Sequence, residues 1–474
     1  MNNKKISKLM LFIGILFISL VVHITAIDLF KHDEYASKSY ASRKDYVRRG
    51  NIYDRNGVLL AHSTGDIKEQ VREYPFNEKY VHIIGYVTKE NNTNEIERLY
   101  NSQLMGESEA PLLGGIMTFL SDTKFAMTGK TEKSGSNLTL TIDNELQHAA
   151  HAALGSYKGA IVAMNCDSGE ILAMVSKPDF NPNPDVYSSE YERIQELGDG
   201  FNGKGIKELY PPASTFKIIV ASALIDNYKE DYIIDGNTQL RTEVKEYGQT
   251  VQKVSSTLDL ATAFKKSSNI YFAESGIELG KEKILEAARN FMFEEKINLE
   301  DFYVANNTLP ADNILTNNRA ISNLAIGQGE VKTTPLHLAM IASAIGNEGV
   351  MMQPYIVSEI SSPSYYKAKP KILKRSVSMD TAQKIKDLMR ACVESGTGIG
   401  ANIPNRGICG KTGTAELDRE NGTSHAHFVG FAPYDDPKIA ISVVIEDVAE
   451  GQSGGGIAAP VAEKVFRKYF ELYG

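Results

Sequence analysis

The sequence predicts an α+β fold, in which an antiparallel sheet is covered by helices on both faces, preceded by an N-terminal transmembrane helix and an extended α+β pedestal. Three observations support this prediction. Strand-like runs lie near both ends of the C-terminal two thirds, helical segments lie between them, and one long uncharged apolar stretch lies at the N-terminus. With 474 residues, of which 42% are apolar and 23% charged, the chain is globular and not a disordered tail.

The first element is the segment 9–27, which is apolar and carries no formal charge. At about 1.5 Å per residue, it is long enough to cross a bilayer. Lys4, Lys5 and Lys8 precede it, so we expect residues 1–8 in the cytoplasm and the main body outside. The alternative is a cleaved signal peptide ending near Ala26, but the apolar stretch is longer than the usual signal. The sequence therefore favours a retained single-pass anchor in the cell membrane.

The pedestal is predicted over residues 28–135, which are polar and show broken periodicity with short apolar runs. From residue 136 the pattern changes. Residues 138–142 alternate between apolar and polar, and residues 144–154 have helical periodicity. We therefore expect a compact domain over residues 136–474.

Within this domain, strands are expected at 159–164 and 170–176, joined by a turn-rich connection. An apolar helix over 214–224 is hydrophobic nearly all round, which predicts a central position. Thr334 and Pro335 suit the N-cap and first position of another helix. Three more strands and a closing helix are expected at 408–416, 427–432, 438–446 and 458–472. One sheet would then be assembled from both ends of the domain.

Charge and cysteine usage exclude several functions. Lys plus Arg number 51 against 59 Asp plus Glu, a formal net charge of −8 without a basic stripe, so nucleic-acid binding is not expected. The three cysteines are too widely spaced for a metal knuckle. His148 and His151 share a helix face but have no third ligand nearby, and His425 and His427 are expected on opposite faces of their strand. The sequence predicts no metal and no cofactor.

Three serines begin the pattern SxxK: Ser121, Ser214 and Ser364. Of these, Ser214 stands at the start of a strongly apolar helix, where a spacing of three puts its hydroxyl and the Lys217 amine on one face. The helix N-terminus also supplies N–H groups for an oxyanion. A serine attacks well only when a neighbour removes its proton, and burial plus a second cation, Lys411, would lower the pKa of Lys217 for that task.

Two further motifs lie downstream. Ser267-Ser268-Asn269 is the SxN of the chain, and Lys411-Thr412-Gly413 is its KTG, on a predicted strand. Ser267 can relay a proton to a leaving amine, and Asn269 can anchor a substrate amide and orient the lysine. A glycine in a strand allows close backbone approach of a substrate. The residues expected to hold a substrate carboxylate and backbone are Lys411, Thr412, Gly413 and Thr414.

SxxK, SxN and KTG in this order, with gaps of roughly 50 and 140 residues, form a strong joint signal. The chain resembles the penicilloyl-serine transferases, and most closely the class B penicillin-binding proteins, which are monofunctional peptidoglycan D,D-transpeptidases. The resemblance covers nearly the whole chain and implies a β-lactamase-like transpeptidase domain over 136–474. Other similar stretches are 49–57, 60–61, 74–75, 82–86, Glu97, Tyr100, 140–143, 169–174, 327–329 and 411–416.

The resemblance implies that Ser214 is acylated by the D-Ala-D-Ala end of a peptidoglycan stem peptide, with Lys217 as base. It also implies an oxyanion hole from the backbone N–H groups of Ser214 and Thr414, acylation by β-lactams, and a SEDS-type glycosyltransferase partner. Two positions depart from the family: Ala213 replaces a usual glycine, and His427 a usual tryptophan.

Two other classes of function stay open. The first is a related hydrolase, either a D,D-carboxypeptidase or a serine β-lactamase. A β-lactamase would need a base that activates water, and the anchored pedestal argues against a free drug-destroying enzyme. The second is non-catalytic: a β-lactam sensor would usually need a cytoplasmic signalling part, and only about eight residues are expected inside. The intact motif set also argues against a purely structural activator. The sequence leaves open the acceptor amine and a role in cell elongation, division or sporulation.

Overall fold

The structure is a computed structural model. Its described residues are 10, 12–19, 47–88, 92–106, 133–197, 203–246, 249–251, 254, 256–361, 364–418, 423–449 and 451–474. Residues 12–19 are helical, but most of the predicted anchor lies outside the described residues. Within the described ranges, no helix is both long and apolar enough to span a bilayer. The single-pass anchor stays a prediction.

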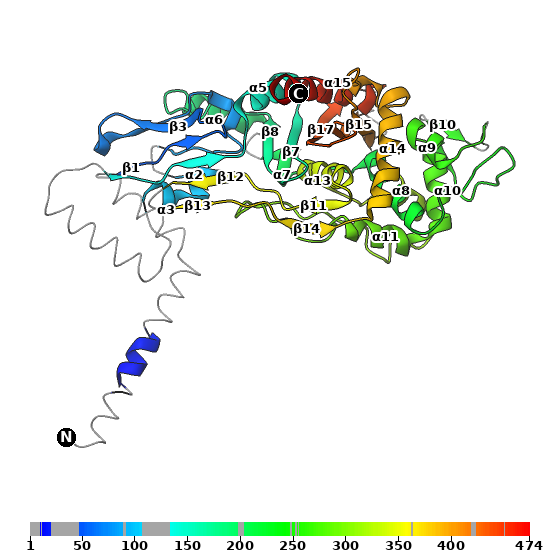
Figure 1. Cartoon of the computed structure of the whole chain (residues 1–474), viewed down its shortest axis with the longest axis horizontal. Coiled ribbons are helices and arrows are strands. Elements are labelled where there is room, and N and C mark those ends of the chain that lie inside the picture. Colours follow the sequence, from blue (N-terminus) through cyan, green and yellow to red (C-terminus); the bar gives the residue numbers. More distant parts are fainter. Residues whose placement is uncertain are drawn as a thin grey trace.

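A five-stranded antiparallel sheet forms the centre of the C-terminal part (Figure 1). Two of its strands come from the beginning of this part and three from its end, which confirms the predicted assembly. In spatial order the strands are β15 (Cys409–Asp418), β16 (Thr423–Ala432), β17 (Ile439–Val448), β7 (Gly159–Asn165) and β8 (Ile171–Lys177).

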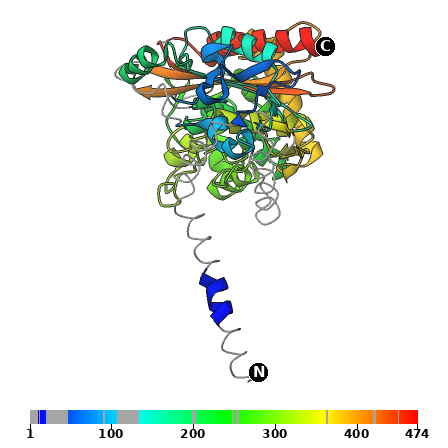
Figure 2. The same cartoon turned by 90° about the vertical axis from the view of Figure 1, so that its left-hand side faces the viewer.

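Helices cover both faces of this sheet, as the sequence predicts. α5 (Asn144–Leu154) and α15 (Ala459–Tyr473) pack on one face through Leu146, Val465 and Phe466, which are all fully buried. In the turned view of Figure 2, α15 (red) lies above the strands and most of the other helices lie below them.

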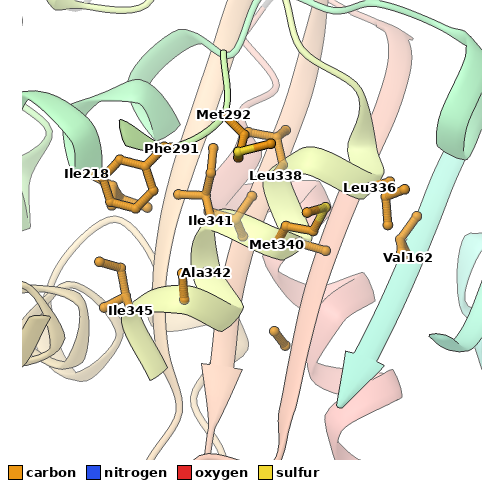
Figure 3. Close-up of a cluster of buried hydrophobic side chains, with 14 of the residues drawn as sticks. Val162, Ile218, Phe291, Met292, Leu336, Leu338, Met340, Ile341, Ala342 and Ile345 are labelled. Carbon is orange, nitrogen blue, oxygen red and sulfur yellow. The ribbon is translucent and has the colours of Figure 1, made fainter. Parts of the chain in front are cut away.

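The opposite face is covered by α13 (Pro335–Gly346), whose residues are all buried. Thr334 caps this helix by accepting a hydrogen bond from the His337 backbone N–H, and Pro335 occupies its first turn, as expected. Ile341 and Ile345 of α13 belong to the same buried hydrophobic cluster as Ile218 of α8 (Lys217–Asp226), and all three are labelled in Figure 3. α8 is therefore part of the core behind the sheet, in the central position predicted for it.

The remaining elements surround this core. A short 3₁₀ turn, η3 (Ala213–Phe216), precedes α8, so the predicted helix over 214–224 begins later than expected. The other elements of this part are α6 (Tyr187–Leu197), α7 (Lys204–Lys207), α9 (Leu260–Lys266), α10 (Asn269–Leu279), α11 (Lys281–Asn290), α12 (Asn318–Ala325), α14 (Met379–Ser395), η4 (Ile399–Ala401), the five-residue π-helix η5 (Gly454–Ala458), β9 (Val244–Glu246), β10 (Gln249–Val251), β11 (Val350–Met352) and β14 (Ile372–Arg375).

The N-terminal part is built on a six-stranded sheet that also takes strands from the C-terminal part. Its order is β13 (Tyr366–Lys367), β12 (Val357–Ile360), β6 (Leu138–Leu140), β2 (Ile52–Tyr53), β3 (Leu59–Thr64) and β4 (Val71–Glu73). β2 pairs in parallel with β6. Because strands from both sides of residue 135 pair in this sheet, backbone hydrogen bonds join the two parts. Smaller elements here are β1 (Val47–Arg48), β5 (Lys133–Ser134), η1 (Ile67–Glu69), η2 (Asn77–Tyr80), α2 (Glu95–Leu99) and α3 (Asn101–Leu104).

A buried ionic centre holds this N-terminal part together. Glu97 is fully buried and accepts hydrogen bonds from the Nε atoms of Arg49 at 2.6 Å and Arg72 at 2.7 Å. Burial alone raises the pKa of the Glu97 carboxyl, but the two guanidinium groups outweigh it and hold the pKa below its ordinary value. The carboxylate thus stays charged.

Candidate active site

The expected nucleophile lies at the junction of η3 and α8. Ser214 belongs to the 3₁₀ turn and is half-buried, whereas Lys217 opens α8 with a fully buried side chain. Burial of an amine favours its neutral form, which is the form that can accept a proton. The turn therefore presents the serine at the cleft while the lysine stays out of water.

The backbone before the nucleophile is strained. Ala213 has a φ of +48°, in the left-handed region that a residue with a Cβ rarely adopts. Its N–H donates to the carbonyl of Gly327 at 2.8 Å. Gly327 has a φ of +72°, and a Cβ there would lie 2.0 Å from the Ala213 oxygen. Gly327 thus permits the close contact that holds the turn before Ser214.

The SxN motif lies at the corner between α9 and α10. Ser267 ends α9 with a φ of +58°, and Ser268 caps α10 by accepting from the Tyr271 N–H. This corner delivers Asn269 to Lys217, whose Nζ lies 2.7 Å from the Asn269 Oδ1 atom and 2.8 Å from the Ser267 carbonyl oxygen. The structure therefore brings the first two motifs together.

The third motif approaches from β15. The Nζ atom of Lys411 donates to the Ser267 hydroxyl at 2.8 Å, and the Lys217 Nζ atom lies 3.5 Å from the same oxygen. Lys411 is fully buried, and burial lowers the pKa of its amine to about 8. The Ser267 hydroxyl therefore bridges two lysines. Four of the five expected catalytic residues, Lys217, Ser267, Asn269 and Lys411, are thus joined by hydrogen bonds, and the fifth, Ser214, lines a cavity that Asn269 also lines.

The expected substrate-binding residues differ in their surroundings. Ser214, Asn269 and Thr414 line one cavity of about 530 Å³. Thr412 lies beside it on the strand, and its hydroxyl donates to the Thr397 hydroxyl at 2.7 Å. A Cβ at Gly413 would lie 3.1 Å from the Pro212 carbonyl oxygen, so the absence of a side chain there also lets β15 approach the nucleophile turn.

Sequence reasoning missed three residues that hold the segment before Ser214. The Tyr210 hydroxyl donates to Glu446 at 2.5 Å, and the Lys204 ammonium donates to the same carboxylate at 2.7 Å. All three side chains are at least nine-tenths buried. No local motif could reveal this contact, because Tyr210 and Glu446 are 236 positions apart.

The expectation that His425 and His427 lie on opposite faces was wrong. Residues two apart on a strand share a face, and the two ring centroids lie 6.5 Å apart beside Tyr210. Burial lowers the pKa of His427 to about 3, so this ring is neutral. Among the residues that the structure describes, no three His, Cys, Asp or Glu side chains are grouped to hold a metal ion.

A serine on a turn before a buried lysine, linked through a second serine to a strand lysine, defines a serine acyltransferase of the penicillin-recognising type. The chain matches the family model described as the penicillin binding protein transpeptidase domain over residues 159–467. Residues 49–136 match the penicillin binding protein A dimerisation domain. The chain belongs to the penicillin-binding protein transpeptidase family.

Curated relatives and solved structures agree with this placement. The peptidoglycan D,D-transpeptidase PbpA of Mycobacterium tuberculosis is 31% identical over 453 residues, which cover 89% of each chain. PbpA of Mycolicibacterium smegmatis is 29% identical, with 97% of each chain covered. A crystal structure of PBPA from Mycobacterium tuberculosis superposes with a TM-score of 0.79 at 29% identity, over 89% of this chain and 99% of that one. The resemblance to class B penicillin-binding proteins is confirmed.

Proposed function

We propose that this chain is a peptidoglycan D,D-transpeptidase that cross-links stem peptides through an acyl-serine intermediate. The observation that carries this proposal is the bridge that the Ser267 hydroxyl forms between Lys217 and Lys411 beside the Ser214 turn. The relatives named D,D-transpeptidases support it, as does a penicillin G acyl-enzyme complex of the Mycobacterium tuberculosis protein, which is 28% identical with a TM-score of 0.77 over 89% of this chain and 99% of that one.

The first half-reaction forms the acyl-enzyme. Lys217, as the neutral amine, accepts the Ser214 proton while the serine oxygen bonds to the carbonyl carbon of the penultimate D-Ala. The backbone N–H groups of Ser214 and Thr414 stabilise the resulting oxyanion. The C–N bond then breaks, and the Lys217 proton passes through the Ser267 hydroxyl to the departing D-Ala amine.

The second half-reaction transfers the acyl group. An acceptor amine bonds to the acyl carbon, the bond from that carbon to the Ser214 oxygen breaks, and the amine proton returns to the serine oxygen through the same lysine and serine. Lys411, Thr412 and Thr414 hold the terminal carboxylate of the donor, and Gly413 allows the substrate backbone to lie along β15. β-Lactams acylate the same serine.

The proposal includes an arrangement in the membrane. Residues 9–27 anchor the chain, 1–8 lie in the cytoplasm, 28–135 form the pedestal and 136–474 the extracytoplasmic transpeptidase domain. The uncharged segment 9–27 and the lysines before it support this topology. The resemblance also supports a SEDS-type glycosyltransferase as partner.

The test is labelling of the full chain in detergent with a fluorescent penicillin, followed over time. We expect stable label on the wild type and none on Ser214→Ala. Ser364→Ala is the matched control, because Ser364 begins another SxxK but precedes the short exposed strand β13. It should label like the wild type.

Other outcomes separate the alternatives. Rapid release of the label, or release of D-Ala without transfer to an added amine, would indicate a hydrolase. No labelling of the folded wild type would overturn the active-site assignment and leave the activator function.

A further inference from the structure

A segment at the edge of the six-stranded sheet carries an excess of positive charge. Residues 365–375, which we name the basic connector, read YYKAKPKILKR and contain five Lys or Arg and no Asp or Glu. No acidic residue lies between Glu359 and Asp380, although the whole chain has a formal net charge of −8. A local excess of positive charge on an acidic protein indicates a surface for an anionic partner.

The backbone of the basic connector is held in place. It begins with β13, the last strand of the six-stranded sheet, and ends with β14, which pairs with β11. Between these strands, the Ala368 N–H donates to the Ser358 carbonyl at 2.8 Å. The Lys371 carbonyl accepts from the Gln353 N–H, also at 2.8 Å. In Figure 1, β13 and β14 lie on the lower side of the body. The positive charges are thus mounted on a fixed backbone.

Large apolar side chains are exposed on the same segment. Tyr365 is 72% exposed, Tyr366 49% and Ile372 69%. Three lysines lie among them and are exposed as well: Lys367, Lys369 and Lys371. Single exposed lysines and tyrosines are common on any protein surface. Their combination suits the headgroup region of a bilayer, because tyrosine rings favour that depth and lysines are attracted to anionic headgroups.

Carboxylates from neighbouring elements offset only part of this charge. Lys374 binds Glu295 at 2.8 Å, and Lys367 lies opposite Glu359 in the pairing of β13 with β12. Within the described residues, no ion pair involves the two lysines at the centre, Lys369 and Lys371. The middle of the basic connector therefore keeps its positive charge.

The membrane is within reach of this surface in the arrangement proposed above, on which this inference rests. The proposed anchor ends at residue 27 and β1 begins at Val47, so residues 28–46 join the anchor to the body. Fully extended, a chain of this length spans at most about 65 Å, at roughly 3.4 Å per residue. A tether also gives the surface a high effective concentration at the bilayer, so individually weak contacts suffice.

We propose that the basic connector is a second membrane contact, which docks on anionic phospholipid headgroups of the leaflet that faces the transpeptidase domain. The lysines bind headgroup phosphates, and the Tyr365 and Tyr366 rings lie between the headgroups. A body held by a single helix is free to tilt, whereas a body held at two places is not. Docking thus fixes the orientation of the six-stranded sheet, and with it the height of the Ser214 cleft above the membrane.

Tryptophan fluorescence tests this contact, because the chain contains no tryptophan. Tyr365→Trp places one reporter on the basic connector of the full chain, which is inserted into preformed vesicles whose phospholipids carry bromine on their acyl chains. We expect bromine to quench the reporter when the vesicles contain phosphatidylglycerol, and much less when they contain phosphatidylcholine alone. Tyr228→Trp is the matched control, because Tyr228 is 90% exposed just after α8. It should not be quenched in either kind of vesicle.

Charge removal tests the role of the lysines. In the Tyr365→Trp chain, Lys369→Gln with Lys371→Gln should lower the ratio of docked to undocked molecules by roughly tenfold or more, since each lysine near an anionic surface contributes about fivefold. Raising the salt from about 0.1 to about 1 M shortens the Debye length from about 10 to about 3 Å and should also release the basic connector. The matched control is Lys158→Gln with Lys464→Gln, at exposed lysines before β7 and on α15, and should keep the quenching.

Several results would overturn the proposal. Equal quenching of Tyr365→Trp in neutral and anionic vesicles, or an equal loss for the two pairs of lysine variants, would exclude docking on anionic lipid. A reporter that responds to soluble polyphosphate but not to vesicles would show a site for a dissolved polyanion instead. A chain that does not float with the vesicles would overturn the anchor, whereas one that floats without quenching overturns only the docking. Penicillin labelling of each variant tests its folding and the proposed function separately.

Discussion

The Lys411 ammonium donates a 2.8 Å hydrogen bond to the Ser267 hydroxyl, although the lysine is fully buried. In the described residues, the Lys411 amine donates hydrogen bonds to the Ser267 hydroxyl and to the Thr412 carbonyl oxygen. Neither acceptor is a carboxylate. The amine therefore bears the cost of burial without a countercharge, and its pKa falls to about 8. The buried charge of Lys411 therefore lowers the free energy of unfolding, and in return the site gains a lysine beside Ser267.

Replacing Lys411 by methionine should stabilise the fold while abolishing acylation. A fall in pKa from 10.5 to about 8 corresponds to a cost of about 3 kcal/mol when the amine is charged. Between pH 8 and 10.5 the unfolded chain holds this proton and the folded chain does not, so wild-type stability rises with pH in that window. Lys411→Met should gain up to about 3 kcal/mol at pH 7, and the gain should vanish towards pH 10.5.

Urea unfolding at pH 7 and pH 9.5 measures this difference, with Lys332→Met, a change at an exposed lysine, as the control. The control should show little change in stability at either pH. A gain for Lys411→Met that does not depend on pH would contradict the assigned pKa direction.

Tyr210→Phe should slow acylation of Ser214. The change removes the hydrogen bond to Glu446 that fixes the segment leading to the nucleophile, and should cost roughly 1–3 kcal/mol of stability. The second-order rate of penicillin acylation should fall severalfold. Tyr434→Phe is the matched control, since its hydroxyl also donates to a carboxylate, Asp387, at 2.5 Å, but on the exposed surface. Equal acylation rates for the two variants would contradict a positioning role for Tyr210.

Sequence patterns predicted the helices and strands whose bounds are set by residues close by in the chain. The helix expected at 144–154 has the observed bounds, because Asp143 caps it and Gly155 ends it. The KTG strand and its two neighbours also follow from β-type runs separated by turn-rich connections. The three motifs converge because α10, which begins at Asn269, packs against α8, and β15 packs against the η3 turn that precedes α8.

Contacts between distant segments could not be predicted in this way. The 3₁₀ turn at Ser214 depends on Gly327, more than a hundred residues away, whose carbonyl binds the Ala213 N–H. The two strand partners of β6, β2 and β12, lie on opposite sides of it in the sequence. Nothing near Glu446 indicates that it binds Tyr210. Arg319 lines the cavity beside Ser214 but belongs to none of the three motifs, so only the fold shows that it lies there.

Gly327→Ala should impair both folding and acylation. Its Cβ would lie 2.0 Å from the Ala213 carbonyl oxygen, so the turn that presents Ser214 must move. Gly451→Ala is the matched control, because its φ of +83° is equally unfavourable for alanine, but a Cβ there meets nothing within 4 Å. The control should lose about 1 kcal/mol and label normally with penicillin. Gly327→Ala should lose more stability and label at least tenfold more slowly; equal behaviour would exclude the predicted clash.

Glu97→Gln should destabilise the pedestal more than any surface change. The carboxylate contacts two buried guanidinium groups, and Glu97→Gln removes the negative charge that both Arg49 and Arg72 face. Breaking a buried ion pair in this way typically costs about 3–5 kcal/mol. Glu286→Gln breaks an exposed pair with Lys283 and should cost about 0–1 kcal/mol. Urea unfolding of both variants measures the difference, and a small loss for Glu97→Gln would show that water reaches the two arginines and that this centre does not hold the pedestal together.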